Sequence, residues 1–137
     1  MKHVATISMA IFLLTACGNI SVNGQQKNLD SPIKTVNAET FKKLIEPGDG
    51  VLIDVRTPEE YESGHIAGAQ NINVNDGSFV EKITSLPKDK TIYVYCRSGK
   101  RSLKAAGILS ENGFKIIYNL DSGILGWQSK GFPVTNP

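Results

Sequence analysis

Two short apolar runs, rich in branched and aromatic residues, constrain the fold more than any other feature. They are VLIDV at positions 51–55 and TIYVY at positions 91–95. Nearly unbroken apolar runs of this length are typical of strands that are covered on both faces. Strands of this kind occur in parallel sheets, whose crossover connections place helices on the two faces.

Helix signals alternate with these runs. Asn37 can cap a helix that continues through Glu46, and Thr57-Pro58-Glu59-Glu60 combines a capping box with proline at the first helical position. Further helices are expected at 79–86, 101–112 and 124–129, and a third strand at 114–118. In the helix at 101–112, Leu103, Ala106 and Gly107 share one face. This alternation predicts an α/β fold with a central, mostly parallel sheet and helices on both faces.

The N-terminal segment has the features of an export signal. Lys2 precedes an apolar run at 4–14, which is shorter than the roughly 20 residues of a bilayer span but typical of a secretory signal. The sequence LTAC at 14–17 resembles a bacterial lipobox, in which cleavage leaves Cys17 first, with diacylglycerol on its sulfur. The alternative is a buried helix followed by an ordinary cysteine.

These signals divide the chain into three parts. We expect a lipoprotein signal peptide at 1–16, a lipid-anchored flexible tether at 17–34, rich in Asn, Gln, Gly and Ser, and one domain at 35–137. The domain would then lie in a bacterial cell envelope, outside the cytoplasm, in the periplasm or at the cell surface. The formal net charge of +2 falls to +1 without the signal, which gives no reason to expect a nucleic-acid partner.

If Cys17 carries lipid, Cys96 is the only free thiol and no internal disulfide is possible. A lone cysteine is unusual in an oxidising compartment, so we expect Cys96 to have a chemical use. It follows a predicted central strand directly and precedes a helix, at the edge where ligands bind in parallel sheets.

Cations surround this thiol in the sequence. Arg97, Lys100, Arg101 and the helix N-terminus are expected to lower the pKa of Cys96 together, from about 8.5 for a free thiol. Gly99 would let the loop curl so that backbone N–H groups point at the sulfur. The pattern predicts a nucleophile in a positive pocket.

Other uses of Cys96 remain as alternatives. A cysteine at a strand end can be a small buried apolar residue. We expect no metal and no cofactor, because Cys96 and His65 do not form a recognisable ligand set. His65 lies in a Gly-His-Ile-Ala-Gly turn, and we interpret it as structural.

Residues 96–102, CRSGKRS, resemble the active-site loop of single-domain rhodaneses, the thiosulfate sulfurtransferases, which follow a Cys-x-x-Gly-x-Arg pattern. Three further stretches agree in order and spacing: LIDVR at 52–56, YESGHIAGA at 61–69 and LDSGILGW at 120–127. The resemblance covers roughly 36–133. Ala67 departs from the proline, and Ser122 from the glycine, that the family more often has.

The resemblance implies a rhodanese-like fold and a persulfide mechanism. Cys96 would take the outer sulfur of thiosulfate or a similar small anionic donor, release sulfite, and pass the sulfur to a thiophilic acceptor, which could be a protein. The expected binding residues form the rest of the loop: Arg97, Ser98, Gly99, Lys100, Arg101 and Ser102. Arg101 is expected to be the main donor ligand.

Four other residues receive supporting or structural interpretations. Asp54 and Arg56 would support the loop, with Arg56 pairing to Glu59 or Glu60. The aromatic residues Tyr61 and Trp127 are interpreted as core packing.

Three competing functions stay open from the sequence. Phosphatases and arsenate reductases of the related cysteine-loop type have one more residue between cysteine and arginine than the four between Cys96 and Arg101. A non-catalytic binding module and a persulfide carrier for a partner protein would have the same loop. We expect a monomeric domain in each case.

Overall fold

Five parallel strands form the centre of the computed structural model, which describes residues 30–137. Their order across the sheet is β1-β5-β4-β2-β3, with β4 in the middle. The strands are β1 (Ile33–Val36), β2 (Val51–Asp54), β3 (Gln70–Asn71), β4 (Ile92–Tyr95) and β5 (Ile117–Leu120). All four residues of β4 are buried, as expected for a central strand covered on both faces.

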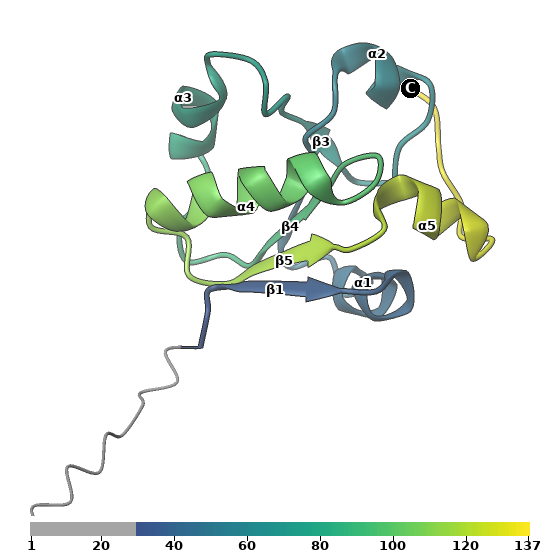
Figure 1. Cartoon of the computed structure of the whole chain (residues 1–137), viewed down its shortest axis with the longest axis horizontal. Coiled ribbons are helices and arrows are strands. Elements are labelled where there is room, and N and C mark those ends of the chain that lie inside the picture. The colour runs from purple at the N-terminus through teal and green to yellow at the C-terminus, as the bar shows by residue number, and fades with distance from the viewer. Residues whose placement is uncertain (1–29) are drawn as a thin grey trace, which may run out of the picture.

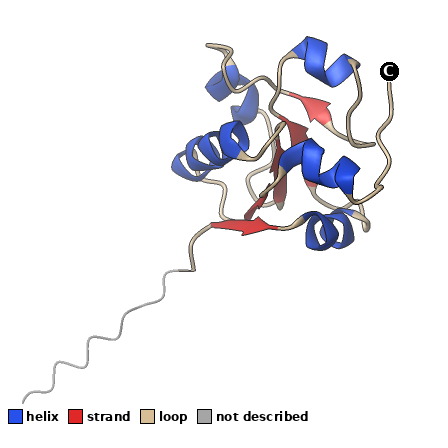
Figure 2. Ribbon diagram, turned by 45° about the vertical axis from the view of Figure 1, so that its right-hand side comes forward, coloured by secondary structure: helices blue, strands red, loops and turns tan. Residues whose placement is uncertain are grey.

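Helices cover both faces of the sheet (Figures 1 and 2). They are α1 (Ala38–Ile45), α2 (Pro58–Glu62), α3 (Phe79–Thr84), α4 (Lys100–Glu111) and α5 (Gly123–Ser129). On one face, α3 and α4 pack on the sheet through Phe79, Ile83 and Leu109. On the other, α1 and α5 pack through Phe41, Ile124 and Trp127. The predicted fold class is therefore confirmed.

The predicted helix starts are confirmed where a cap was recognised. The Asn37 side chain accepts a hydrogen bond from the Thr40 N–H at 2.9 Å and begins α1. Thr57 and Glu60 form the reciprocal bonds of a capping box at the start of α2, where Pro58 occupies the first helical position.

The edges of the sheet differ from the sequence-based expectation. β1 was not predicted, and its first residues, Ile33 and Lys34, lie in the expected tether. Ile33 pairs with Ile117 in parallel register, so the ordered domain begins before position 35. The cause is that β1 is an edge strand whose central residues Lys34 and Thr35 are exposed, which leaves no continuous apolar run. The two-residue strand β3 was missed for a similar reason.

Two further expectations are wrong in detail. The third predicted strand was placed at 114–118 but begins at Ile117, because Phe114 is buried in the core from the turn that precedes the strand. Leu103 was placed with Ala106 on one face of its helix, yet its side chain is 51% exposed. The buried face of α4 consists instead of Ser102, Ala105, Ala106 and Leu109.

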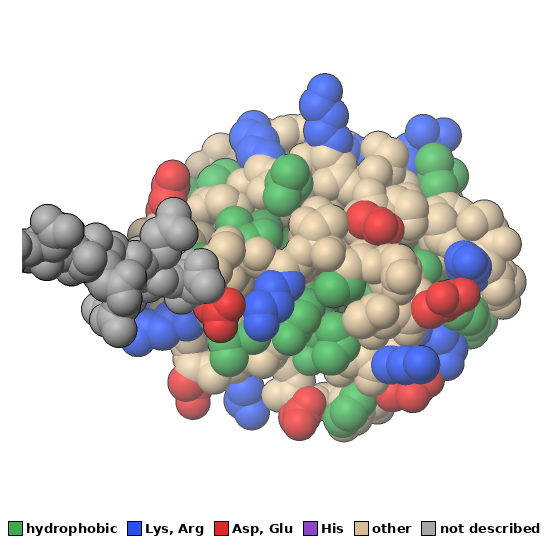
Figure 3. Space-filling model, turned by 60° about the horizontal axis from the view of Figure 1, so that its bottom comes forward, with side chains coloured by type: hydrophobic (Ala, Val, Ile, Leu, Met, Phe, Trp, Pro, Cys, Tyr) green, Lys and Arg blue, Asp and Glu red, His purple; other side chains and the backbone are tan. Residues whose placement is uncertain are grey.

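The N-terminal predictions fall outside the described residues. The signal peptide at 1–16 and the lipid-bearing Cys17 both lie before position 30. Within residues 30–137, no helix combines the length and the apolar character that a membrane crossing requires. Figure 3 shows one face of the domain, where cationic and acidic side chains are interspersed without a large block of one sign.

Candidate active site

Cys96 lies immediately after β4 and is 1% exposed. The backbone N–H of Gly99 donates a hydrogen bond to Cys96 Sγ at 3.1 Å, and Ser102 Oγ lies 3.3 Å from the same sulfur. Ser102 Oγ is also 3.1 Å from the Gly99 carbonyl oxygen, so its single proton can turn toward the sulfur when the sulfur is negative. The loop therefore closes around its own thiol.

Close backbone packing fixes the shape of this loop. Gly99 has a φ of +99°, and a Cβ there would lie 2.0 Å from the carbonyl oxygen of Asp121. Gly123 has a φ of +59°, and a Cβ there would lie 2.4 Å from the backbone of Arg97. Only glycine fits at both positions. Ser122, the departure from the family pattern, has an ordinary φ of −101°, so the serine is tolerated.

The start of α5 holds the loop from the side. The Ile124 N–H donates to the Cys96 carbonyl at 2.9 Å, and the Leu125 N–H donates to the Arg97 carbonyl at 3.1 Å. These bonds orient two peptide groups of the loop, so that the Cys96 and Arg97 carbonyls point toward α5 while the Gly99 N–H points at the sulfur. The reactive loop is thus preorganised by two helices, α4 and α5.

The environment lowers the pKa of the Cys96 thiol below its ordinary value. Burial alone raises this pKa, but hydrogen bonds from the Ser102 hydroxyl and from the backbone N–H groups of Ser102, Ser98 and Gly99 outweigh it. A smaller fraction of the protein is therefore in the inert thiol form at neutral pH. A lowered pKa is the direction that a nucleophilic cysteine requires.

The main source of this stabilisation differs from the expectation. Arg97 and Lys100 were expected to lower the pKa, but both side chains are exposed at the surface, where solvent screens their charges. Hydrogen-bond donors in direct contact with the sulfur are the main cause instead. Arg101 is only partly exposed, and its own pKa is raised first by the hydrogen bond to Glu60 and also by the charge of Cys96.

Arg101 forms a two-pronged ion pair with Glu60 on α2. Its Nη1 is 2.7 Å from Glu60 Oε2, and its Nη2 is 2.9 Å from Glu60 Oε1. Glu60 Oε2 also accepts from the backbone N–H of Thr57 at 3.0 Å. The hydrogen bond from Arg101 is the main reason that the pKa of Glu60 falls to about 2. Sequence reasoning missed this contact, because the capping box explained Glu60 without any distant partner.

Asp54 and Arg56 pair with each other beside the loop. Arg56 Nη2 is 2.6 Å from Asp54 Oδ2, and Arg56 Nε is 3.0 Å from Asp54 Oδ1. Arg56 also donates to the Gly64 carbonyl at 2.7 Å. The expected pairing of Arg56 with Glu59 or Glu60 is therefore wrong. Asp54 is two residues away along the chain and equally buried, whereas Glu60 is held by Arg101.

The aromatic and histidine residues that the sequence singled out have structural contacts. Tyr61 and His65 stack with ring centroids 3.7 Å apart, and His65 Nδ1 lies 3.0 Å from the Tyr61 carbonyl oxygen. Trp127 is 3% exposed and donates from Nε1 to the Pro133 carbonyl at 2.8 Å. These contacts agree with the structural interpretation of all three residues.

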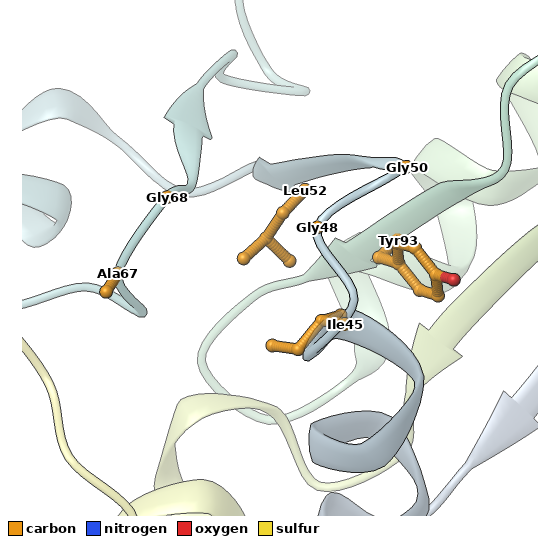
Figure 4. Close-up of a pocket in the computed structure, with 7 residues that line it drawn as sticks. All are labelled: Ile45, Gly48, Gly50, Leu52, Ala67, Gly68 and Tyr93. Atoms are coloured by element: carbon orange, nitrogen blue, oxygen red, sulfur yellow. The ribbon is translucent and has the colours of Figure 1, made fainter.

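Figure 4 shows a pocket of about 180 Å³ whose lining does not include Cys96. Its lining combines the C-terminal end of α1 and the following turn with β2, β4 and the turn before β3: Ile45, Gly48, Gly50, Leu52, Ala67, Gly68 and Tyr93. The polar groups that converge on Cys96 are absent from this lining. Among the described residues, no three His, Cys, Asp or Glu side chains cluster as a metal site would require.

The candidate nucleophile of this α/β domain is thus a buried cysteine at the carboxyl end of a central parallel strand, whose sulfur accepts hydrogen bonds from its own loop. Residues 37–130 match the model of the rhodanese-like domain family. The chain belongs to this family.

Named relatives and a solved structure agree with the assignment. The chain is 31% identical over 106 residues to a sulfurtransferase of Allochromatium vinosum, covering 77% of this chain and 97% of that one. It is 34% identical over 101 residues to YrkF of Bacillus subtilis, provisionally named a sulfur carrier protein, covering 73% of this chain and 54% of YrkF.

The structure resembles the crystal structure of a rhodanese-related protein from Thermoplasma volcanium. The TM-score is 0.66 and the sequence identity is 33%, covering 74% of this chain and 97% of that chain. The matched region is nearly all of that solved chain, so that crystal structure shows a rhodanese-related domain of this extent by itself.

Proposed function

We propose that the protein is a sulfurtransferase that moves sulfane sulfur from thiosulfate, or a similar small anionic donor, to a thiophilic acceptor through a persulfide on Cys96. The observation that carries the proposal is the convergence of the Gly99 N–H and the Ser102 hydroxyl on Cys96 Sγ. Donors aimed at Cys96 Sγ stabilise the thiolate that attacks in the first step and the thiolate that leaves in the second.

The first step forms one S–S bond and breaks another. The electron pair of the Cys96 thiolate attacks the outer sulfur of thiosulfate, and sulfite leaves with the electrons of the old bond. In the second step an acceptor nucleophile attacks the outer sulfur of the persulfide, and Cys96 leaves as a thiolate. No external oxidant or reductant is needed, because each step is a displacement at sulfur.

The loop residues supply the binding chemistry in this proposal. Arg101 has N–H groups beyond the two that Glu60 occupies, so it can donate to the sulfonate oxygens of the donor while remaining fixed. Arg97 and Lys100 are exposed on the same loop and would draw anions toward it. Asp54 and Arg56 neutralise each other and would support the adjacent segment.

Intact mass spectrometry of the reduced domain, residues 30–137, tests the proposal. Thiosulfate should add the mass of one sulfur to the wild type, with release of an equal amount of sulfite, and should leave Cys96→Ser unchanged. No added sulfur on folded wild type would overturn the thiosulfate mechanism. Hydrolysis of an aryl phosphate or reduction of arsenate by the same sample would then favour the oxyanion enzymes.

A persulfide carrier is the second candidate, supported by the similarity to YrkF. The burial of Cys96 fits this role as well, because a 1% exposed sulfur is protected from bulk solvent. Continuous release of sulfite with cyanide as acceptor would identify an enzyme. Loading of a single sulfur without turnover until a protein thiol is added would identify a carrier. The absence of loading by any sulfane donor would leave a binding module.

We also propose that the domain is anchored by lipid on Cys17 in a bacterial cell envelope, outside the cytoplasm. The support is the lipobox-like sequence LTAC after a signal-like apolar run. A diacylglycerol together with an acylated amine would provide enough chains for stable anchoring. Cys17→Ser should move the protein from the membrane fraction to the soluble fraction when the signal is still cleaved. Membrane protein that still incorporates labelled lipid would refute this assignment.

A further inference from the structure

Two exposed leucines flank the reactive loop. Leu103 on α4 is 51% exposed and Leu125 on α5 is 44% exposed, although most large apolar side chains of the described domain are buried. The Leu103 N–H donates to the Gly99 carbonyl at 3.2 Å, and the Leu125 N–H donates to the Arg97 carbonyl at 3.1 Å. Both leucines are therefore attached by their backbones to the loop that encloses the thiol.

The loop next to these leucines in the structure also carries exposed cationic side chains. Arg97 and Lys100 are exposed on the loop, and no ion pair involves either of them within residues 30–137. The acidic residue Glu60 pairs with Arg101. Asp121 is an exposed acidic residue, and its backbone carbonyl packs against Gly99 of the loop. We name as the loop rim the four exposed residues Arg97, Lys100, Leu103 and Leu125, which lie in the loop or in the first turns of α4 and α5. Two of them are cationic and two are apolar.

The burial of Cys96 makes this surface relevant to sulfur transfer. The outer sulfur of a persulfide lies only about 2 Å beyond Sγ, so it remains close to the loop. A small thiol can reach it alone, whereas a protein thiol must bring its surrounding surface against the loop. Apolar contacts with the leucines would add affinity, and charge complementarity would speed the encounter.

We propose that the loop rim is a docking surface for a protein sulfur acceptor, which presents its thiol beside acidic and apolar residues. The inference rests on the proposed sulfur transfer by Cys96, and it names the class of acceptor. An acidic partner complements Arg97 and Lys100, and its apolar residues cover Leu103 and Leu125. A basic or purely polar partner would leave the leucines exposed and place like charges together.

Binding is tested without sulfur chemistry in the Cys96→Ser domain, residues 30–137. The probe is a synthetic peptide with Asp, Glu and Leu around a central Ser, compared with a peptide in which Lys replaces the acidic residues. Amide shifts in two-dimensional NMR should change at 97–103 and 124–126 with the acidic peptide only. Equal shifts with both peptides, or shifts located elsewhere, would overturn the proposal.

Transfer is tested with Cys96 loaded by thiosulfate, or by polysulfide if thiosulfate does not load it. The acceptors are the acidic peptide with Cys at its centre and glutathione. The double variant Leu103→Ser with Leu125→Ser should slow transfer to the peptide about fivefold or more and leave transfer to glutathione unchanged. Equal slowing of both acceptors, or of neither, would contradict docking on the leucines.

A matched control uses the two exposed apolar residues that lie elsewhere, Val80 at 46% and Ile116 at 49% exposure. Val80→Ser with Ile116→Ser should not change transfer to the peptide. The two proposals fail in distinguishable ways. Absence of the persulfide with every sulfane donor is a failure of the proposed function, whereas a normal persulfide with no peptide preference is a failure of the docking surface alone.

Discussion

The segments that follow β2 and β4 lie side by side at one edge of the sheet but treat charge in opposite ways. Asp54, the last residue of β2, is in register with Tyr95, the last residue of β4. After β2, the buried guanidinium of Arg56 meets the buried carboxylate of Asp54, so the two charges cancel. After β4, hydrogen-bond donors converge on Cys96 without a facing carboxylate.

The charges of Asp54 and Arg56 have a structural use, whereas a charge on Cys96 is the candidate for a reactive one. In the pair after β2, each charged side chain is the counterion of the other, so neither needs a ligand to neutralise it. The loop after β4 places hydrogen-bond donors on Cys96 Sγ and so favours a negative charge on that sulfur. The first of these neighbouring strand ends therefore holds the edge together, and the second carries the candidate nucleophile.

The largest effect on stability is expected from breaking the pair after β2. Arg56→Met leaves the Asp54 carboxylate buried without its partner, which should lower the free energy of unfolding by about 3 to 5 kcal/mol. Urea denaturation at neutral pH measures this loss.

Lys42→Met is the matched control, because it removes the cation of an exposed pair with Glu46. It should change the free energy of unfolding by less than about 1 kcal/mol. Similar losses for the two variants would show that the Asp54–Arg56 pair behaves as a surface pair and not as a buried one.

Distorting the loop after β4 should have a smaller effect on stability but a large one on reactivity. Gly99→Ala introduces a Cβ 2.0 Å from the Asp121 carbonyl oxygen, in a backbone conformation that favours glycine. We expect a loss of about 1 to 3 kcal/mol and a higher pKa for Cys96, because the Gly99 N–H is displaced from the sulfur. Alkylation of Cys96 by iodoacetamide at neutral pH should slow about tenfold.

Gly131→Ala is a control that introduces backbone strain at a glycine outside the Cys96 loop. Gly131 also has a positive φ, of +77°, but a Cβ there would meet no atom within 4 Å. This variant should lose about 1 kcal/mol of stability and alkylate at the wild-type rate. Slower alkylation in Gly131→Ala would mean that general destabilisation, and not the local position of Gly99, controls the thiol.

The smallest effect is expected at the contact between α2 and the loop. Glu60→Gln weakens the pair with Arg101, which is partly exposed, so the loss should be at most about 1 kcal/mol. The pKa of Glu60 is lowered from 4.5 to about 2, so the wild-type carboxylate stabilises the fold above pH 4.5. That advantage is lost as the pH falls from 4.5 through about 2.

The free energies of unfolding of wild type and Glu60→Gln, compared from pH 7 to pH 2.5, check this prediction. The gap between the two proteins should be constant near neutral pH and narrow below pH 4.5. A gap that does not change with pH would show that the ionised carboxylate of Glu60 has no part in the stability.

The central fold could be predicted from the sequence, because β2 and β4 are buried on both faces and therefore read as nearly continuous apolar runs. The caps at Asn37 and Thr57 were equally clear, since a side-chain cap depends on residues only three apart. The edge strands β1 and β3 could not be recognised. Each is short and partly exposed, and its pairing is determined by a neighbour far along the chain.

The candidate site likewise has features that the sequence predicts and features that it does not. The position of Cys96 and the need for Gly99 follow from a local pattern of strand, loop and helix. The ion pair of Arg101 with Glu60 joins residues 41 positions apart, and no local spacing indicates it. The pKa of Cys96 is lowered mainly by hydrogen bonds such as that from the Ser102 hydroxyl, and not by the exposed cations. This result depends on burial and direct contact, which the sequence does not display.

The pKa of Cys96 tests the central claim most directly. It can be measured from the pH dependence of iodoacetamide alkylation in the wild type and in Ser102→Ala, with Cys96→Ser as the unreactive blank. We expect a wild-type midpoint below that of a free thiol, and a higher midpoint in Ser102→Ala, because one donor to the thiolate is lost. A wild-type midpoint at or above that of a free thiol, or no change in Ser102→Ala, would contradict a thiolate held by the loop's own hydrogen bonds.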